Sequence, residues 1–205
     1  YIKDGDTVWN PGWQPTKTPL DRYSCRHGLG YTILEGEKDG ICAAQELFVP
    51  KGDACELDRL TLTNRSDRPR ELDVFSYVEF CLWDAVDDST NFQRNFSTGE
   101  VEVEPCAIYH KTEYRERRDH YAVFWSNTPV TSFDTARDAF CGVYGGPADP
   151  QAVRAGHCSG SIAHGWAPVG ALHIHVTLAP GEEKKILFGL GYIENPQEEK
   201  FTAPG

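Results

Sequence analysis

The side chains best suited to chemistry lie close together, between positions 83 and 95. They combine one aromatic ring, three carboxylates, three amides and one guanidinium, namely Trp83, Asp84, Asp87, Asp88, Asn91, Gln93, Arg94 and Asn95. A planar ring can cover the apolar face of a sugar, while the polar groups can hydrogen-bond to its hydroxyls. The run therefore indicates a site for a polyhydroxylated ligand. An ordinary acidic surface loop is the alternative, because loops are generally polar.

Two predicted strands flank this run and would position it. Before it, Val78, Phe80 and Leu82 alternate with more polar neighbours; after it, Val101 and Val103 alternate with glutamates. This two-residue period is typical of a half-buried β-strand. A tight hairpin needs only about two to five connecting residues. The longer connection here favours a loop with a function of its own.

A second aromatic segment opens the chain. Trp9 and Trp13 stand in the run WNPGWQPTKTP, whose prolines and glycine exclude a helix or a central strand. The segment is predicted to be an extended loop. Its two tryptophans either pack on the rim of the fold or form a wall of a carbohydrate site.

Other possible sites are weaker. His173 and His175 share one face of a predicted strand, as two metal ligands would, but no third ligand follows at a readable spacing. The carboxylates at 84, 87 and 88 could suggest the acid pair of a glycosidase, but they lie on a loop without supporting structure. We therefore predict no metal site and no catalytic residue in this chain.

Composition narrows the class of protein. The chain has 205 residues, 40% of them hydrophobic, and a formal net charge of −11, which disfavours nucleic acid and anionic membranes as partners. No run approaches the roughly 18 apolar residues of a membrane span. The seven cysteines are odd in number and lack C-x-x-C spacing. They indicate reduced, mostly buried thiols of a cytoplasmic protein.

Short alternating segments and turn signals predict an all-β fold. The clearest features are a hairpin turn at Asp39-Gly40 and a final hairpin that joins 172–178 to 186–192. A further strand is expected at 140–144, and no convincing helix of ten or more residues is visible. Many short strands at regular spacing imply a large two-sheet antiparallel β-sandwich.

Several ungapped blocks carry a resemblance to a known family. They are DGDTVWNPGWQP from Asp4, RHGLGYT from Arg26, NFQRN from Asn91, IYHKTEYRERRDHYAVF from Ile108 and LGYIENPQEEK from Leu190. In these blocks the chain resembles the N-terminal domain of glycoside hydrolase family 94, which holds the cellobiose, cellodextrin and chitobiose phosphorylases. The likeness covers most of the chain.

The resemblance implies both a fold and an activity. It implies a galactose-mutarotase-like supersandwich over residues 1–205, as one domain of a longer phosphorylase whose catalytic helical barrel would follow Gly205. The implied reaction converts cellobiose and inorganic phosphate into α-glucose 1-phosphate and glucose with inversion. Phosphate would be a substrate, and no cofactor is expected. A homodimer is expected, as are sugar contacts by Gln93 and Arg94, supported by Asn91, Asn95 and Trp13.

Two other roles remain open at this point. The chain could act alone as a carbohydrate-binding module, or it could be a non-catalytic scaffold that holds a barrel or a second copy. The substrate could equally be a longer cellodextrin, because the loops that would discriminate include segments outside this sequence.

Overall fold

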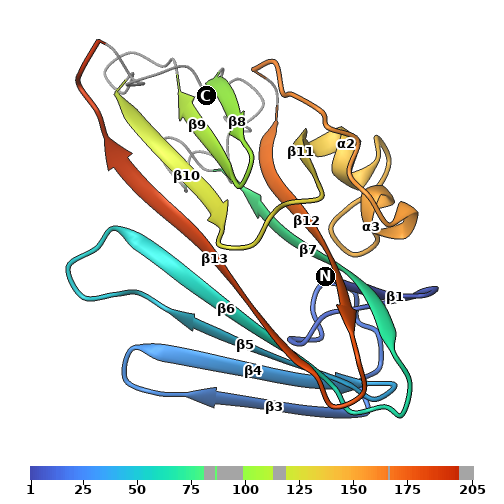
Figure 1. The fold of residues 1–205 in the computed structure, drawn as a ribbon. Coiled ribbons are helices and arrows are strands. Elements are labelled where there is room, and N and C mark those ends of the chain that lie inside the picture. Colours follow the sequence, from blue (N-terminus) through green and yellow to red (C-terminus); the bar gives the residue numbers. More distant parts are fainter. Residues whose placement is uncertain (81–85, 87–98, 113–118, 166, 199–205) are drawn as a thin grey trace.

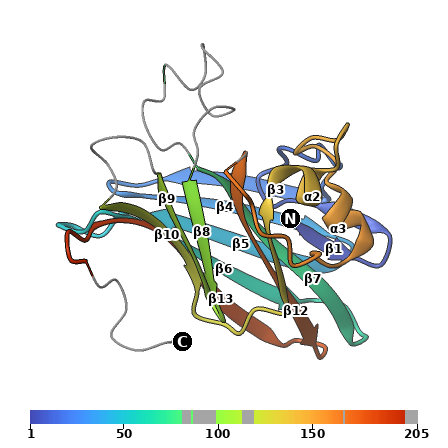
Figure 2. The same ribbon diagram turned by 90° about the horizontal axis from the view of Figure 1, so that it is seen from above.

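The fold is a sandwich of two antiparallel β-sheets, which confirms the predicted fold class (Figure 1). The computed structural model describes residues 1–80, 86, 99–112, 119–165 and 167–198. Figure 2 shows the sandwich from above, with the larger, eight-stranded sheet curving past the smaller, five-stranded one.

The larger sheet has eight strands and the smaller has five. In spatial order, the larger sheet contains β3 (Arg22–His27), β4 (Tyr31–Lys38), β5 (Ile41–Phe48), β6 (Cys55–Asn64), β13 (Glu183–Glu194), β10 (His120–Ser126), β9 (Ala107–Thr112) and β8 (Gly99–Glu104). The smaller sheet contains β11 (Ser132–Ala136), β12 (Pro168–Leu178), β7 (Arg70–Glu79), β1 (Ile2–Asp4) and β2 (Thr7–Trp9).

The main core lies between the two sheets and is built from alternate residues of their strands. The smaller sheet contributes Leu72 and Val74 from β7 and Ile174 and Val176 from β12, all almost fully buried. The larger sheet contributes residues such as Leu60, Leu62, Ile108, Phe124, Ile186 and Phe188. The two-residue period in the sequence is thus the pattern of core-facing side chains.

The predicted turn at Asp39-Gly40 is confirmed. It joins β4 to β5 in register, with Lys38 opposite Ile41. Asp39 has φ 49° and Gly40 has φ 80°. Positive φ at both central residues is the signature of a tight two-residue hairpin, which this residue pair favours.

The predicted hairpin between 172–178 and 186–192 is wrong. β12 pairs with β7 and β11, whereas β13 pairs with β6 and β10, so the turn after Leu178 carries the chain from one sheet to the other. The connection from β6 to β7 crosses between the sheets in the same way. Alternation marks the core-facing side of a strand, but it does not say which sheet the strand joins.

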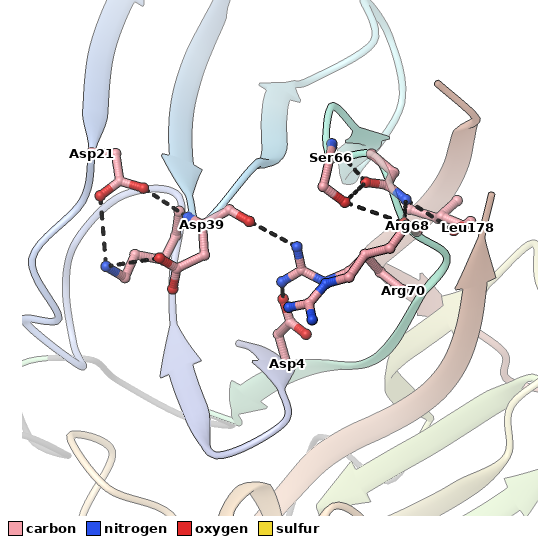
Figure 3. Close-up of polar contacts among 9 residues, drawn as sticks. Asp4, Asp21, Asp39, Ser66, Arg68, Arg70 and Leu178 are labelled. Carbon is pink, nitrogen blue, oxygen red and sulfur yellow. Dashed lines mark hydrogen bonds and ion pairs between the residues drawn. The ribbon is translucent and has the colours of Figure 1, made fainter. Parts of the chain in front are cut away.

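A polar network fastens the end of the sandwich where the chain crosses (Figure 3). Asn64 donates from Nδ2 to the carbonyl oxygens of Arg68 and Leu178, at 2.8 and 3.0 Å. Arg70 forms an ion pair with Asp4 and donates to the carbonyl of Asp39 at 2.7 Å. These bonds tie both crossing turns and the β4–β5 hairpin to the smaller sheet.

Two short helices cover the outer face of the smaller sheet (Figure 1). They are α2 (Arg137–Cys141) and α3 (Gln151–Ala155), and with Phe75 and Ala171 they form a second buried cluster. The strand expected at 140–144 is therefore wrong, because α2 occupies the start of that segment. The ring of Phe140 stacks on Tyr77 at 4.6 Å, so its burial comes from packing against β7.

Candidate functional site

The predicted sugar loop leaves one sheet and enters the other. β7 ends at Glu79 in the smaller sheet, and β8 begins at Gly99 in the larger sheet. Residues 81–98 therefore connect two sheets and do not close a hairpin. Asn91, Gln93, Arg94 and Asn95 lie outside the described residues, so their role in sugar binding stays a prediction.

The end of β7 that leads into this loop is firmly held. The carboxylate of Glu79 accepts hydrogen bonds from the Tyr77 hydroxyl at 2.7 Å and from Arg137 Nε at 3.0 Å. Phe80 is buried, and its ring lies 5.0 Å from that of His110. A loop that must place side chains on a ligand benefits from such a rigid stem.

The two N-terminal tryptophans have different surroundings. Trp9 is fully buried in the core, so for this residue the packing interpretation holds. Trp13 is 44% exposed. Its backbone N–H donates to the Asn10 carbonyl at 3.0 Å, and its backbone carbonyl accepts from the Lys17 N–H at 2.8 Å. An exposed ring on a braced loop is available to a ligand, so the binding role of Trp13 stays a prediction.

The segment that carries Trp13 packs on β4, far along the larger sheet from β8. The neighbouring residues Pro11 and Gly12 pack against Gly36 and Leu34 of β4. β4 and β8 are six strands apart in the larger sheet. At about 4.8 Å per strand, this is on the order of 29 Å along the sheet.

A cavity that the sequence did not reveal lies between the sheets. Its volume is about 290 Å³, and the polar side chains that line it include Asn10, Gln45, Asp58 and Ser76. Gln45 Nε2 donates to Asp58 Oδ2 at 2.7 Å, whereas Asp58 Oδ1 is buried and has no partner among the described residues. Burial raises the pKa of Asp58 to about 6. The sequence feature that could have indicated this cavity is Asp58, which lies on the same face of its strand as Leu60 and Leu62.

A hydrogen-bonded chain joins a serine, a histidine and an aspartate on the smaller sheet. Ser132 Oγ lies 2.8 Å from His173 Nδ1, and His173 Nε2 lies 2.9 Å from Asp73 Oδ1. His175 Nδ1 lies 2.9 Å from the same oxygen of Asp73. Burial alone would raise the pKa of Asp73, but the bonds from His175 and His173 lower it. This order of groups is the one that activates a serine nucleophile.

The surroundings of these hydrogen-bonded groups show that their role is structural. Ser132 Oγ already accepts the Cys158 N–H at 3.0 Å, and His173 is buried with its ring stacked on Phe75. The nearby N–H groups of Ser159 and Ser161 donate to Asp134 and are not available to an oxyanion. The two histidines thus join β11, β12 and β7. No group of three metal-binding side chains occurs in the described part of the chain.

The buried cysteines are unsuited to nucleophilic chemistry. The six cysteines in the described ranges are free thiols, and Cys42, Cys141 and Cys158 are buried. Burial raises the pKa of each of these three thiols. Because the thiolate is the reactive form, these residues contribute packing and not catalysis.

Comparison with known proteins identifies the fold family. The family described as "Glycosyl hydrolase 94, supersandwich domain" matches residues 1–203. The chain belongs to this family. Its strand order and crossing turns are therefore those of a glycosyl hydrolase 94 supersandwich. The helices of the described residues include none with the length and apolar character of a membrane span.

Two relatives of this supersandwich are named as phosphorylases. Over 89% of its length the chain is 40% identical to a solabiose phosphorylase from Paenibacillus borealis, and over 93% it is 35% identical to an N,N'-diacetylchitobiose phosphorylase from Vibrio proteolyticus. It spans about a quarter of each, 24% in both cases.

A solved structure of a protein assigned as a kojibiose phosphorylase, from the human microbiome, has a similar fold. Its TM-score is 0.55 with 12% identity, and the match covers 96% of this chain and 22% of that one. At this identity the likeness supports the supersandwich fold alone.

Proposed function

We propose that this chain is the substrate-positioning and dimer-forming domain of an inverting disaccharide phosphorylase that acts on cellobiose. The observation that carries the proposal is the family match over residues 1–203, together with relatives that are named as disaccharide phosphorylases. The proposed reaction yields α-glucose 1-phosphate and glucose from cellobiose and inorganic phosphate.

The proposed chemistry is a single displacement. A phosphate oxygen forms a bond to the anomeric carbon as the bond to the glycosidic oxygen breaks, and a carboxylic acid donates its proton to that departing oxygen. We assign both the acid and the phosphate site to a helical barrel elsewhere in the same polypeptide. No catalytic residue is assigned to this chain, and no cofactor is required beyond phosphate as a substrate.

The proposed contribution of this chain is to hold the departing glucose. Gln93 and Arg94 would hydrogen-bond to its hydroxyls, with Asn91 and Asn95 beside them, and Trp13 offers an exposed ring. The contact would reach across a homodimer in the cytoplasm. The rigid stem formed by Tyr77, Glu79 and Arg137 supports this positioning role.

The test uses the natural-length protein. Release of glucose 1-phosphate is measured with phosphate and, in turn, cellobiose, solabiose and N,N'-diacetylchitobiose, and the mass of the protein in solution is measured by light scattering. We expect the highest kcat/KM with cellobiose and the mass of a dimer. A clear preference for another disaccharide would overturn the cellobiose assignment, and a monomeric mass would overturn the dimer.

A further inference from the structure

The outer face of the larger sheet is divided into two parts. Over β3 to β6 this face is polar and is crossed by ion pairs. Arg26–Glu35 joins β3 to β4, Arg59–Glu46 joins β6 to β5, and Arg65, which follows β6, pairs with Glu37 of β4. Such a face is expected where a sheet meets water. Over β9 and β10 the same face instead carries aromatic rings.

Three aromatic side chains stand on these two strands. Ile108 and Phe124 point into the core, so their neighbours Tyr109, Tyr121 and Trp125 point outward. Tyr109 lies opposite Val123, midway between Tyr121 and Trp125 along β10. Diagonal neighbours on one sheet face are about 7–8 Å apart. The three residues therefore follow each other in a zigzag across the two strands.

The ring at one end of this row is fixed by a glycine. A Cβ atom on Gly189 of β13 would lie 2.4 Å from Cε2 and Nε1 of Trp125. The indole therefore rests directly on the backbone of β13, where any other residue would displace it. Because β13 and β9 lie on opposite sides of β10, the indole leans toward β13 and away from Tyr109.

The two tyrosines lie in a hollow with a polar rim. The hollow has a volume of about 540 Å³, within the range typical of ligand sites, and is lined by Glu100, Val101, Glu102, Tyr109, Lys111, Tyr121 and Glu198. Lys111 Nζ lies 2.9 Å from Glu100 Oε2. Aromatic faces next to carboxylates and an ammonium group suit a ligand that is apolar on one side and hydroxylated at its edges.

We propose that Tyr109 and Tyr121 form a carbohydrate-binding site for a neutral oligosaccharide, separate from the predicted loop at 91–95. Three carboxylates face one ammonium in the hollow, so anionic sugars and phosphates are repelled. The same charges argue against a protein partner, because the centre of a protein interface is depleted of charged residues. The site would retain a longer glucan near the enzyme.

The test measures binding of cellohexaose to the natural-length protein by calorimetry, without phosphate so that no turnover occurs. We expect Tyr109→Ala and Tyr121→Ala each to weaken one class of sites about threefold to tenfold. Tyr109→Phe keeps the ring and should bind nearly as well as wild type. The matched control is Tyr144→Ala, because Tyr144 is fully exposed and lies on the segment between α2 and α3.

The outcome is independent of the proposed phosphorylase activity. The tyrosine variants should keep the kcat and KM of wild type for any small disaccharide that the protein cleaves, because the hollow is not assigned to the reaction. Binding of cellohexaose that is unchanged in both alanine variants would overturn the site. So would an equal loss in Tyr144→Ala, or no binding at all by wild type.

Discussion

His110 is a buried residue with a ring that stays uncharged. It is fully buried beside Phe80, and neither ring nitrogen has a partner among the described residues. Burial lowers the pKa of His110 to about 4. In the unfolded chain the ring takes up a proton near pH 6.5, so the unfolded state binds more protons between pH 6.5 and pH 4. The free energy of unfolding must therefore fall as the pH falls through this window.

We predict that His110→Leu removes this acid sensitivity. The loss in wild type is on the order of 3 kcal/mol once the pH is below 4, and leucine cannot take up a proton. Urea unfolding at pH 7 and pH 4.5 measures the difference. His164→Leu provides the control, because it makes the same substitution at an exposed histidine. An unchanged slope in His110→Leu would show that the ring is hydrated or paired.

Asp58 is expected to have the opposite effect to His110 on how the free energy of unfolding depends on pH. Its folded pKa is raised to about 6 by burial, so the folded state holds a proton between pH 3.8 and pH 6 that the unfolded state has lost. The stability that Asp58 contributes is therefore present at low pH and is lost as the pH rises through this window. We predict that Asp58→Asn is more stable than wild type at pH 7, by up to about 3 kcal/mol, and that its stability falls more steeply on acidification. A variant less stable than wild type at pH 7 would show that the charged carboxylate is stabilised in the cavity.

Arg94 is the residue whose predicted role is most open to kinetic test. A guanidinium presents forked donors to adjacent sugar hydroxyls, and a hydrogen bond to a charged group contributes roughly 1.5–3 kcal/mol. Arg94→Ala in the natural-length enzyme should weaken use of glucose in the synthetic direction about tenfold to a hundredfold. Apparent affinity for phosphate should change much less.

The control for Arg94 is lysine, which keeps the charge but loses the fork and should restore activity only partly. Glucose and glucose 1-phosphate are varied separately for each variant. A glucose dependence that is unchanged in a folded, dimeric Arg94→Ala would show that residues 91–95 form an ordinary surface loop.

At the scale of elements, the crossing turns depend on one buried ion pair. The side chains of Arg70 and Asp4 are only 7% and 14% exposed, and Arg70 also donates to the turn at Asp39 (Figure 3). Removal of one partner leaves a buried charge without compensation. We predict that Asp4→Ala lowers the free energy of unfolding by about 3–5 kcal/mol, measured by urea denaturation.

The exposed pair Arg154–Asp149 provides the comparison, with side chains 58% and 66% exposed. Asp149→Ala should cost less than about 1 kcal/mol, because exposed ion pairs are screened by water. Equal losses in Asp4→Ala and Asp149→Ala would mean that Arg70 finds water or another partner when Asp4 is absent.

Local chemistry in the sequence predicts elements better than it predicts their partners. Asp39-Gly40 specifies its turn because both residues tolerate positive φ, and the alternation in β7 and β12 identifies Leu72, Ile174 and Val176 as core residues. Whether β12 continues into a hairpin or crosses to the other sheet depends on contacts across more than a hundred positions. The bond from Asn64 to the Leu178 carbonyl is one of these, and no local pattern reveals it.

The candidate site was predictable to a smaller extent. Trp9 and Trp13 look alike in the sequence, and only their three-dimensional surroundings separate the buried ring from the exposed one. Asp58 breaks the apolar face of its strand and could have been noticed. The Ser132–His173–Asp73 chain could not, because its members come from three strands that become neighbours only in the folded sheet.

At the scale of the whole molecule, this supersandwich is expected to be inactive by itself. The chain spans 24% of the solabiose phosphorylase that it resembles, and its net charge of −11 with no glycine-rich phosphate loop gives phosphate no evident site. The hydrogen-bonded serine, histidine and aspartate hold strands together, and the nearby N–H groups of Ser159 and Ser161 already donate to Asp134. Phosphorolysis needs a proton donor and a phosphate site on opposite sides of one glycosidic bond, and neither is assigned to these residues.

We therefore predict that the isolated 205-residue chain releases no glucose 1-phosphate from cellobiose and phosphate, whereas the natural-length protein does. Far-ultraviolet circular dichroism serves as the control, since a β-dominated spectrum shows that the isolated chain is folded as the two-sheet sandwich. A folded but inactive chain assigns catalysis to the remainder of the enzyme. Phosphorolysis by the isolated chain, lost when one of its own residues is substituted, would place the catalytic acid and the phosphate within this sandwich.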